Sequence, residues 1–330
     1  MSRTALVAVG GNALVADNDH SSIDHQFGAA RRLAGSLREM AADGWRFVVT
    51  HGNGPQVGFI LRRSDLVAEI APEIPRLELD VCVADSQGGI GYILSSALIN
   101  EWRSAHLPAR VTAMVTHTAV SLSDPAFENP TKPIGSFYSA EEARRLERSE
   151  GWAMVEDSGR GWRRVVPSPR PLRVVEIEAV AALLREGFTV IAGGGGGIPV
   201  VEEDDGTFRG IEAVIDKDFA SALMASALGV DLLVITTGVP QVAIDFGTPQ
   251  QRFIDTMGVA ELEQHLADGQ FPPGSMGPKI EAALQFLRSG GREVLITSPE
   301  QLGAALAGST GTRLVSDPEA ASSKQRSVAA

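Results

Sequence analysis

Short apolar runs rich in β-branched residues alternate along this chain with longer segments whose apolar residues recur at helical spacing. The apolar runs occupy residues 5–10, 46–52, 110–117, 188–193, 231–237 and 293–298. Helical spacing is found at residues 25–42 and 85–102, from residue 216 onward, and after residue 275. Because the short runs lack a clean two-residue alternation, we expect both faces of each strand to be buried, as in a parallel sheet covered by helices. The pattern therefore predicts an α/β fold.

One stretch interrupts this alternation. Between residues 123 and 171 the polar and apolar positions lose their rhythm, and Trp152 and Trp162 lie in mixed polar sequence. Prolines stand at positions 125, 130, 133, 167, 169 and 171. Because such frequent prolines break regular elements, we expect residues 124–172 to form a small protruding lid inserted into a domain of residues 1–316. Residues 317–330 are mostly small and polar, and disorder is expected there.

Composition narrows the range of partners. Of the 330 residues, 44% are hydrophobic, which is enough to build a substantial core. The net charge of −12 disfavours nucleic acid or an anionic membrane as the main partner, because both attract positive surfaces. The single cysteine, Cys82, cannot form an internal disulfide, and the first apolar run is too short for a signal peptide or a membrane span. We expect a cytoplasmic protein.

Three of the expected strands end in turns with an unusual glycine content. The turns are Gly10-Gly11-Asn12, His51-Gly52-Asn53-Gly54 and the five consecutive glycines at 193–197. In an open parallel sheet, ligands bind beyond the carboxyl ends of the strands. Glycine permits positive φ and lets peptide N–H groups approach an anion without an intervening Cβ. One such turn is weak evidence, since ordinary tight turns use the same residues, but three at one edge predict a binding site.

Familiar nucleotide motifs do not account for these turns. Neither Gly10-Gly11 nor the run at 193–197 shows the G-x-G-x-x-G spacing followed by an acidic residue, and the Walker-type G-x-x-x-x-G-K-[ST] pattern is absent. The six histidines do not form a metal-binding signature, and Ser86 and Ser275 lack the context of a nucleophile elbow. Any bound phosphate must therefore be neutralised by lysines elsewhere in the chain.

The chain contains few lysines, which makes their positions informative. Lys217 stands between Asp216 and Asp218 at a helix start, where one carboxylate can cap the helix while another holds the ammonium. Lys279 follows a glycine turn into an amphipathic helix whose first N–H groups suit a phosphate. Lys132 lies in the proline-rich segment, whereas Lys324, in the polar tail, is expected to be a solvated surface residue.

Glycine turns combined with fixed ammonium groups indicate phosphoryl transfer. No nucleophile or metal cluster is evident in the sequence, and phosphoryl transfer requires little covalent help from the protein. It requires in-line positioning of the reactants and neutralisation of the charge on the transferring oxygens. The residues alone leave the identity of the substrate open.

Eight motifs carry a family resemblance. In chain order they are VAVGGNAL, THGNGPQVG, DSQGGIGY, NPTKPIG, GWRRVVPSP, IAGGGGGIPV, AVIDKDFASALMA and FPPGSMGPKIEAA. Together they resemble the carbamate kinases, from about residue 4 to residue 315. The resemblance implies the amino acid kinase fold, a three-layer αβα sandwich with a mainly parallel open central sheet. It also implies the reversible reaction of ATP and carbamate to ADP and carbamoyl phosphate, Mg²⁺ accompanying the nucleotide, and a homodimer.

The resemblance assigns roles to particular residues. The N-terminal half would bind the transferred phosphate and carbamate through Gly10, Gly11, Asn12, Gly52, Asn53 and Gly54, with Gly194, Gly195 and Gly196 beneath the phosphates. Lys132 would reach onto the substrate from the lid. Lys217 and Lys279 would clamp the phosphoryl group from the nucleotide side, with Asp218 orienting both lysines. The nucleotide would also lie against Thr237, Gly238, Val242, Gly274, Ser275 and Met276.

Two other functions stay open. The chain departs from the family pattern at Gly193, at Gly277 and at Val83 with Asp85, which bears on the substrate and on nucleotide fit. A kinase of another small carboxylate, giving an acyl phosphate, is one alternative. A non-catalytic protein that binds nucleotide or carbamoyl phosphate is the other. A degenerate enzyme is expected to have lost at least one of the four charged site residues, and all four are present.

Overall fold

A computed structural model describes residues 3–15, 22–157, 159 and 161–316. The tail at 317–330, for which disorder is expected, lies outside the described residues. None of the helices in these ranges combines the length and the apolar character that crossing a membrane requires.

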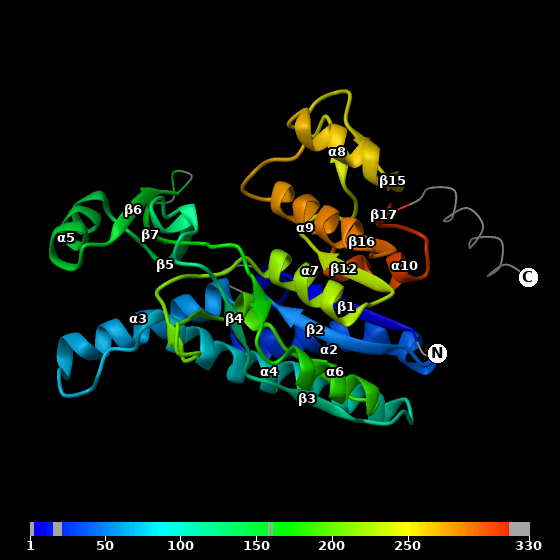
Figure 1. Cartoon of the computed structure of the whole chain (residues 1–330), viewed down its shortest axis with the longest axis horizontal. Coiled ribbons are helices and arrows are strands. Elements are labelled where there is room, and N and C mark those ends of the chain that lie inside the picture. Colours follow the sequence, from blue (N-terminus) through cyan, green and yellow to red (C-terminus); the bar gives the residue numbers. More distant parts are fainter. Residues whose placement is uncertain (1–2, 16–21, 158, 160, 317–330) are drawn as a thin grey trace, which may run out of the picture.

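A central eight-stranded sheet organises the described chain (Figure 1). Its strands, in spatial order, are β15 (Thr256–Gly258), β17 (Thr312–Val315), β16 (Glu293–Thr297), β12 (Leu232–Thr236), β1 (Thr4–Val9), β2 (Arg46–His51), β9 (Thr189–Ile191) and β3 (Val111–Ala113). Every neighbouring pair is parallel except β16 with β17. The mainly parallel sheet expected from the sequence is confirmed.

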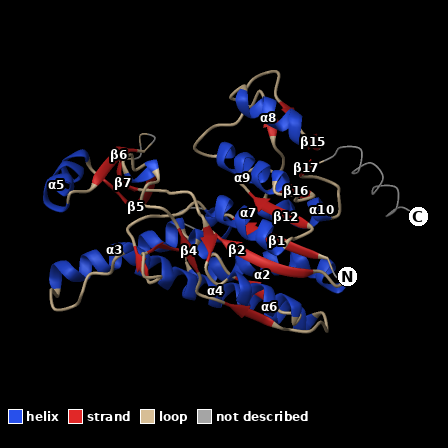
Figure 2. Cartoon of the chain, in the orientation of Figure 1, coloured by secondary structure: helices blue, strands red, loops and turns tan. Residues whose placement is uncertain are grey.

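Helices cover both faces of this sheet and complete a three-layer αβα sandwich (Figure 2). One face is covered by α2 (Ile23–Ala42), α4 (Leu79–Ser104) and α10 (Leu302–Leu306), and the other by α6 (Ile177–Arg185), α7 (Lys217–Leu228), α8 (Val259–Ala267) and α9 (Met276–Arg288). Alternate residues of β1 divide between the two cores, Ala5 and Val7 facing the first and Leu6 and Ala8 the second. Because both faces are buried, the strand sequence shows no polar alternation.

The prediction of a single strand at residues 110–117 is wrong. The chain instead forms two short strands in two sheets, β3 in the central sheet and β4 (His117–Ala119) in a second one. The N–H of Met114 still donates a hydrogen bond to the carbonyl of Ile191 in the central sheet. Two residues later, the carbonyl of Thr116 accepts one from the N–H of Ile198, which begins a strand of the second sheet. The second sheet has the order β11 (Phe208–Gly210), β10 (Ile198–Glu202), β4, β8 (Arg173–Val174).

A separate three-stranded sheet lies within the proline-rich segment. Its order is β5 (Lys132–Tyr138), β7 (Trp162–Val166), β6 (Ala153–Glu156), and α5 (Ala140–Glu150) joins β5 to β6. This unit projects beside α3 (Gly54–Ile70), away from the central sheet (Figure 1). A Cβ on Gly58 of α3 would lie 3.2 Å from the Cα of Gly135, so the two backbones nearly touch. The N–H of Arg170 donates to Asp124 Oδ2 at 2.8 Å and ties the two ends of the segment together.

The remaining described elements are short. They are α1 (Gly11–Leu14), the antiparallel pair β13 (Ala243–Ile244) and β14 (Arg252–Phe253), and the 3₁₀ helices η1 (Pro125–Phe127), η2 (Gly194–Gly196) and η3 (Pro299–Gln301).

Candidate active site

The first two glycine turns meet beyond the carboxyl ends of β1 and β2. The N–H of Gly52 donates to the carbonyl of Val9 at 2.8 Å, and the N–H of Gly10 donates to Thr236 Oγ1 of β12 at 2.9 Å. A Cβ on Gly52 would lie 2.6 Å from the backbone nitrogen of Gly11, which leaves no space for a side chain. Asn12 follows in α1, and Gly54 begins α3. The structure therefore brings the two turns together.

The third turn, Gly193–Gly197, forms η2 at the end of β9 and is entirely buried. Gly193, Gly195, Gly196 and Gly197 have φ between +65° and +93°, a region in which side chains are strained. An added Cβ on Gly194 would overlap the His51 ring, and one on Gly195 would overlap the amide of Asn53. The run must therefore be glycine partly because other protein groups press against it. Among the described hydrogen bonds, the N–H groups of Gly194 and Gly195 donate to no protein acceptor.

Two residues of α4 hold these turns in place, and neither was assigned a role in the expected site. Gln87 is buried; its Nε2 donates to the carbonyl of Gly194 and its Oε1 accepts from the N–H of Thr116. Ser86 Oγ accepts from Asn53 Nδ2 at 2.8 Å. The motif DSQGGIGY contains both residues, but only the fold shows that they face the glycine run. Their contacts fix the backbone that a bound anion would meet.

His51, at the end of β2, is buried and electrically neutral near neutral pH. Burial is the main cause that lowers its pKa to about 4, and the nearby Lys217 ammonium adds to the effect. Its Nδ1 lies 3.2 Å from the carbonyl oxygen of Gly52. A neutral ring packed against Gly194 supports the turn sterically and adds no positive charge to it.

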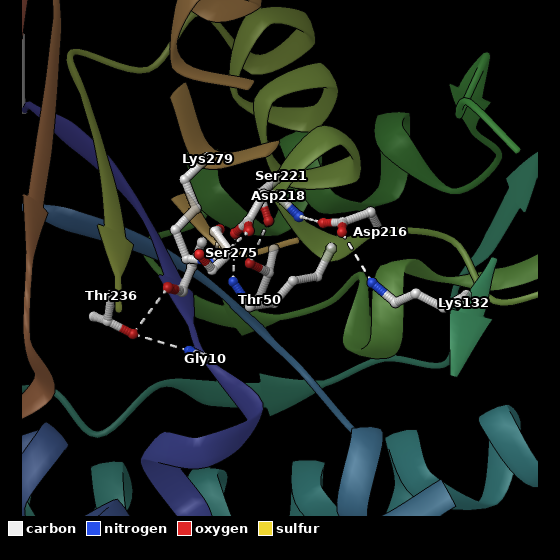
Figure 3. A network of polar contacts seen from close by, with 11 residues as sticks. Gly10, Thr50, Lys132, Asp216, Asp218, Ser221, Thr236, Ser275 and Lys279 are labelled. Atoms are coloured by element: carbon white, nitrogen blue, oxygen red, sulfur yellow. Dashed lines mark hydrogen bonds and ion pairs between the residues drawn. The ribbon is translucent and has the colours of Figure 1, made fainter. Parts of the chain in front are cut away.

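Asp218 forms ion pairs with two of the candidate lysines (Figure 3). Its Oδ1 accepts a hydrogen bond from Lys217 Nζ, and its Oδ2 accepts one from Lys279 Nζ at 3.2 Å. The carboxylate is almost fully buried at the first turn of α7, while Lys279 reaches it from α9. One buried anion therefore holds two ammonium groups that would otherwise repel each other.

The third lysine, Lys132, approaches the same place from β5. Its Nζ lies 2.9 Å from Oδ2 of Asp216, the N-cap residue of α7 (Figure 3). Oδ1 of Asp216 accepts the N–H of Asp218 at 2.9 Å. Burial raises the pKa of Asp216, but the Lys132 ammonium, this N–H group and the Lys217 ammonium together outweigh it and lower the pKa to about 2. The sequence indicated a capping carboxylate here but not this pairing.

The residues expected on the nucleotide side lie around the ends of β12 and the start of α9. Thr237 follows β12 and its N–H donates to the carbonyl of Thr297, at the end of β16. Ser275 is the N-cap residue of α9, and its carbonyl lies 3.4 Å from Lys279 Nζ. Val242 is buried in the core, and its N–H donates to Thr312 Oγ1. Gly238, Gly274 and Ser275 are exposed, whereas Val242 is buried.

Within the described residues, no three His, Cys, Asp or Glu side chains are grouped so that they could hold a metal ion. Both oxygens of Asp218 accept from lysines, and those of Asp216 accept from Lys132 and a backbone N–H. Mg²⁺ in kinase sites is commonly bound through substrate phosphates and water with few protein ligands. If Mg²⁺ is used here, these carboxylate oxygens are already occupied, and the ion would need ligands from a bound phosphate and water.

Comparison with known proteins shows to which family this chain, with its glycine turns and paired lysines, belongs. A family model, "Amino acid kinase family", matches residues 3–298. The chain belongs to the amino acid kinase family. "Carbamate kinase-like protein YahI" of Escherichia coli is 48% identical over 316 residues, 96% of this chain and 99% of the relative. "Carbamate kinase" of Pyrococcus horikoshii is 43% identical over 314 residues, 95% and 99% of the two chains.

A solved member of the amino acid kinase family has the same architecture over almost its whole length. The structure described as carbamate kinase from Giardia lamblia bound to AMP-PNP matches with a TM-score of 0.89 at 39% identity, covering 96% of this chain and 99% of that one. The resemblance stated from the eight motifs is thus confirmed, and so is the amino acid kinase fold.

Two glycines at which this member of the amino acid kinase family departs from the expected pattern occupy tight places. A Cβ on Gly193, where φ is +65°, would lie 3.1 Å from Met224 Cε. A Cβ on Gly277, in the first turn of α9, would lie 3.1 Å from the carbonyl oxygen of Pro272. A larger residue at either position requires its neighbours to shift. A side chain at these two positions would therefore crowd Met224 and Pro272.

Proposed function

We propose that this protein is a carbamate kinase, which transfers a phosphoryl group reversibly between ATP and carbamate to give ADP and carbamoyl phosphate. The observation that carries the proposal is the pairing of Lys217 and Lys279 on the buried carboxylate of Asp218, beside three glycine turns. Relatives named carbamate kinase that align over nearly the whole chain support the same reaction.

On the nucleotide side, Lys217 and Lys279 neutralise negative charge on the phosphoryl group as it moves between the two oxygens. Fixed ammonium groups act most strongly where charge develops in the transition state, because they need no reorganisation at that moment. Asp218 keeps both groups in position, so their mutual repulsion does not disperse them before the substrate binds. The nucleotide can lie on four residues that are exposed or partly exposed, namely Thr237, Gly238, Gly274 and Ser275.

On the substrate side, carbamate is too small for a shaped pocket of side chains, so backbone donors supply most of the recognition. We assign this recognition to the backbone of the turns at Gly10–Gly11 and Gly52–Gly54 and to the N–H groups of Gly194 and Gly195. Lys132 reaches the site from β5, and we assign residues 124–172 as a lid over the substrate. When bound, Mg²⁺ would offset charge on the nucleotide phosphates, held chiefly by those phosphates and water.

Another small carboxylate stays open as the substrate. Two relatives, at 48% and 44% identity, are named carbamate kinase-like rather than carbamate kinase. A kinase of such an acid would use the same lysines and form an acyl phosphate. A binder without turnover is disfavoured, because Lys132, Lys217, Asp218 and Lys279 are all present and meet in one network.

The test is ATP formation from ADP, Mg²⁺ and carbamoyl phosphate by the purified protein, with acetyl phosphate as a parallel donor. Rapid ATP formation from carbamoyl phosphate that is lost in Lys217→Ala supports the proposal. Faster turnover of acetyl phosphate favours another carboxylate. Absence of turnover with both donors, while ADP still binds, leaves a regulatory binder as the explanation and overturns the proposal. Light scattering of the same sample tests the homodimer that we also propose.

A further inference from the structure

Asp216 divides its two carboxylate oxygens between two parts of the molecule (Figure 3). Oδ1 accepts the N–H of Asp218 and caps α7, the helix that begins with Lys217. Oδ2 accepts Lys132 Nζ at 2.9 Å, and Lys132 is the first residue of β5 in the protruding unit. A single side chain thus connects that unit to the end of α7 on which the candidate catalytic residues lie.

The Lys132–Asp216 pair is placed where an incoming anion can reach it. The side chain of Lys132 is 36% exposed and that of Asp216 is 19% exposed, whereas Asp218 is only 4% exposed. Three ammonium groups and two carboxylates leave the network with one excess positive charge. The Lys132 ammonium has three N–H donors, so it can donate to a phosphorylated substrate while it still donates to Asp216.

The Lys132 side chain needs such a partner. A lysine side chain has four flexible methylene groups and many accessible rotamers, so an unpaired ammonium would not stay at one place. Backbone pairing with Val166 fixes the start of β5 but leaves the side chain free to turn. The carboxylate of Asp216 supplies the fixed point.

We propose that Asp216 is a positioning residue that holds the Lys132 ammonium at the site, where the same ammonium also binds the phosphorylated substrate. Binding makes and breaks no covalent bond; Lys132 keeps its ion pair with Asp216 and adds a hydrogen bond to the anion. While the pair is intact, it also restrains β5 and its neighbour β7. This inference rests on the proposed function, because carbamoyl phosphate is taken as the anion that Lys132 binds.

A purely structural role for Asp216 predicts different behaviour. If the residue only caps α7, asparagine should replace it without loss, since Asn and Asp are about equally good N-cap residues. Asp216→Asn keeps an oxygen acceptor for the N–H of Asp218 but removes the charge that holds Lys132. The substitution therefore separates positioning from capping.

The experiment compares wild type, Asp216→Asn, Lys132→Met and the double variant. Initial rates give kcat and KM for carbamoyl phosphate and for ADP, and hydrogen exchange without substrate follows the amides of 132–138 and 162–166. We expect Asp216→Asn to raise the KM for carbamoyl phosphate by about fivefold, the equivalent of a weak ion pair, with the KM for ADP nearly unchanged. Hydrogen exchange should be faster in both segments of Asp216→Asn. The KM of the double variant for carbamoyl phosphate should be no higher than that of Lys132→Met.

A matched control removes another carboxylate that pairs with a cation of the same unit. Glu212 Oε1 lies 2.7 Å from Nη2 of Arg164 on β7. We expect Glu212→Gln to leave the KM for carbamoyl phosphate unchanged. If it raises this KM as much as Asp216→Asn does, any lost ion pair suffices and the assignment of Asp216 is overturned.

Four further outcomes decide the proposal. The proposal is overturned if Asp216→Asn has the kinetics and the hydrogen exchange of wild type. It is also overturned if the effects of the two single substitutions on KM add fully in the double variant. If wild type does not use carbamoyl phosphate, the proposed function fails, and hydrogen exchange alone then decides whether Asp216 restrains β5 through Lys132. If circular dichroism shows that Asp216→Asn does not fold, Lys132→Met replaces it, and unchanged exchange in that variant overturns the proposal.

Discussion

The ammonium of Lys279, on α9, lies 3.2 Å from Oδ2 of Asp218, on α7. The contact joins residues 61 positions apart in the chain, and both side chains are largely buried. The other oxygen of the carboxylate is taken by Lys217. Because a buried anion fixes two cations before any ligand binds, the positive charge of the site is organised in advance, which is the condition under which electrostatic catalysis is most effective.

Replacement of Lys217 tests this electrostatic role. Lys217→Ala is expected to lower kcat by about 10²-fold with little change in ADP affinity, because the charge acts mainly in the transition state. Initial rates of ATP formation and ADP titration by calorimetry measure the two quantities. Arg288→Ala is the control, since it removes an exposed cation of α9 that pairs with Glu263. Unchanged turnover in Lys217→Ala would remove this residue from the reaction.

Replacement of Lys132 tests the lid assignment. Lys132→Ala is expected to raise the KM for carbamoyl phosphate by about tenfold or more, as removal of a charged hydrogen bond to the substrate does. The KM for ADP should change little, because Lys132 approaches the site from β5 rather than from α7 or α9. Steady-state rates with each substrate varied in turn make the distinction. A defect confined to ADP would contradict the assignment.

The fold was largely predictable because its strands are buried on both faces and its helices show regular apolar spacing. The division of residues 110–117 between two sheets was not. It depends on the contact of Thr116 with Gln87, 29 positions away, and on the pairing of β4 with β10. No local pattern in the sequence encodes either contact.

The candidate site shows the same limit. Lys217 and Lys279 stood out because lysines are few and both lie beside helix starts, where backbone geometry is recognisable in sequence. The pairing of Lys132 with Asp216 could not be recognised in the sequence, since Asp216 lies 84 positions further along the chain. Gln87 gave no local sign of its role, because a buried amide in a helix is defined only by what the fold places opposite it.

The glycine run is expected to tolerate a methyl group poorly at Gly195. Gly195→Ala places a Cβ onto the amide of Asn53 at a φ of +67° and should lower kcat/KM by about tenfold and stability by about 2–3 kcal/mol. Gly206→Ala is the matched control, because φ there is +81° but no atom lies within 4 Å of the added Cβ. Urea unfolding and initial rates measure both variants. Equal effects would show that backbone strain alone, and not the contact with Asn53, requires glycine at 195.

Acid is expected to weaken the protein through His51. Its pKa is lowered from 6.5 to about 4 by burial, so below pH 6.5 the unfolded chain binds a proton that the folded protein excludes. The stability from this group is complete above pH 6.5 and is lost as the pH falls toward 4, by about 3 kcal/mol in all. Asp216, whose pKa is about 2, loses its contribution only at lower pH.

Urea unfolding of wild type and His51→Gln at a series of pH values between 7.5 and 4.5 measures this effect. Because the two proteins differ only at residue 51, the difference between the two stability curves isolates His51. We expect the wild-type curve to fall more steeply below pH 6.5, and the variant to lose most of this slope while starting from lower stability at pH 7.5. Parallel curves would mean that His51 accepts a proton as readily in the folded protein as in the unfolded chain, which would contradict its burial as a neutral support for the glycine run.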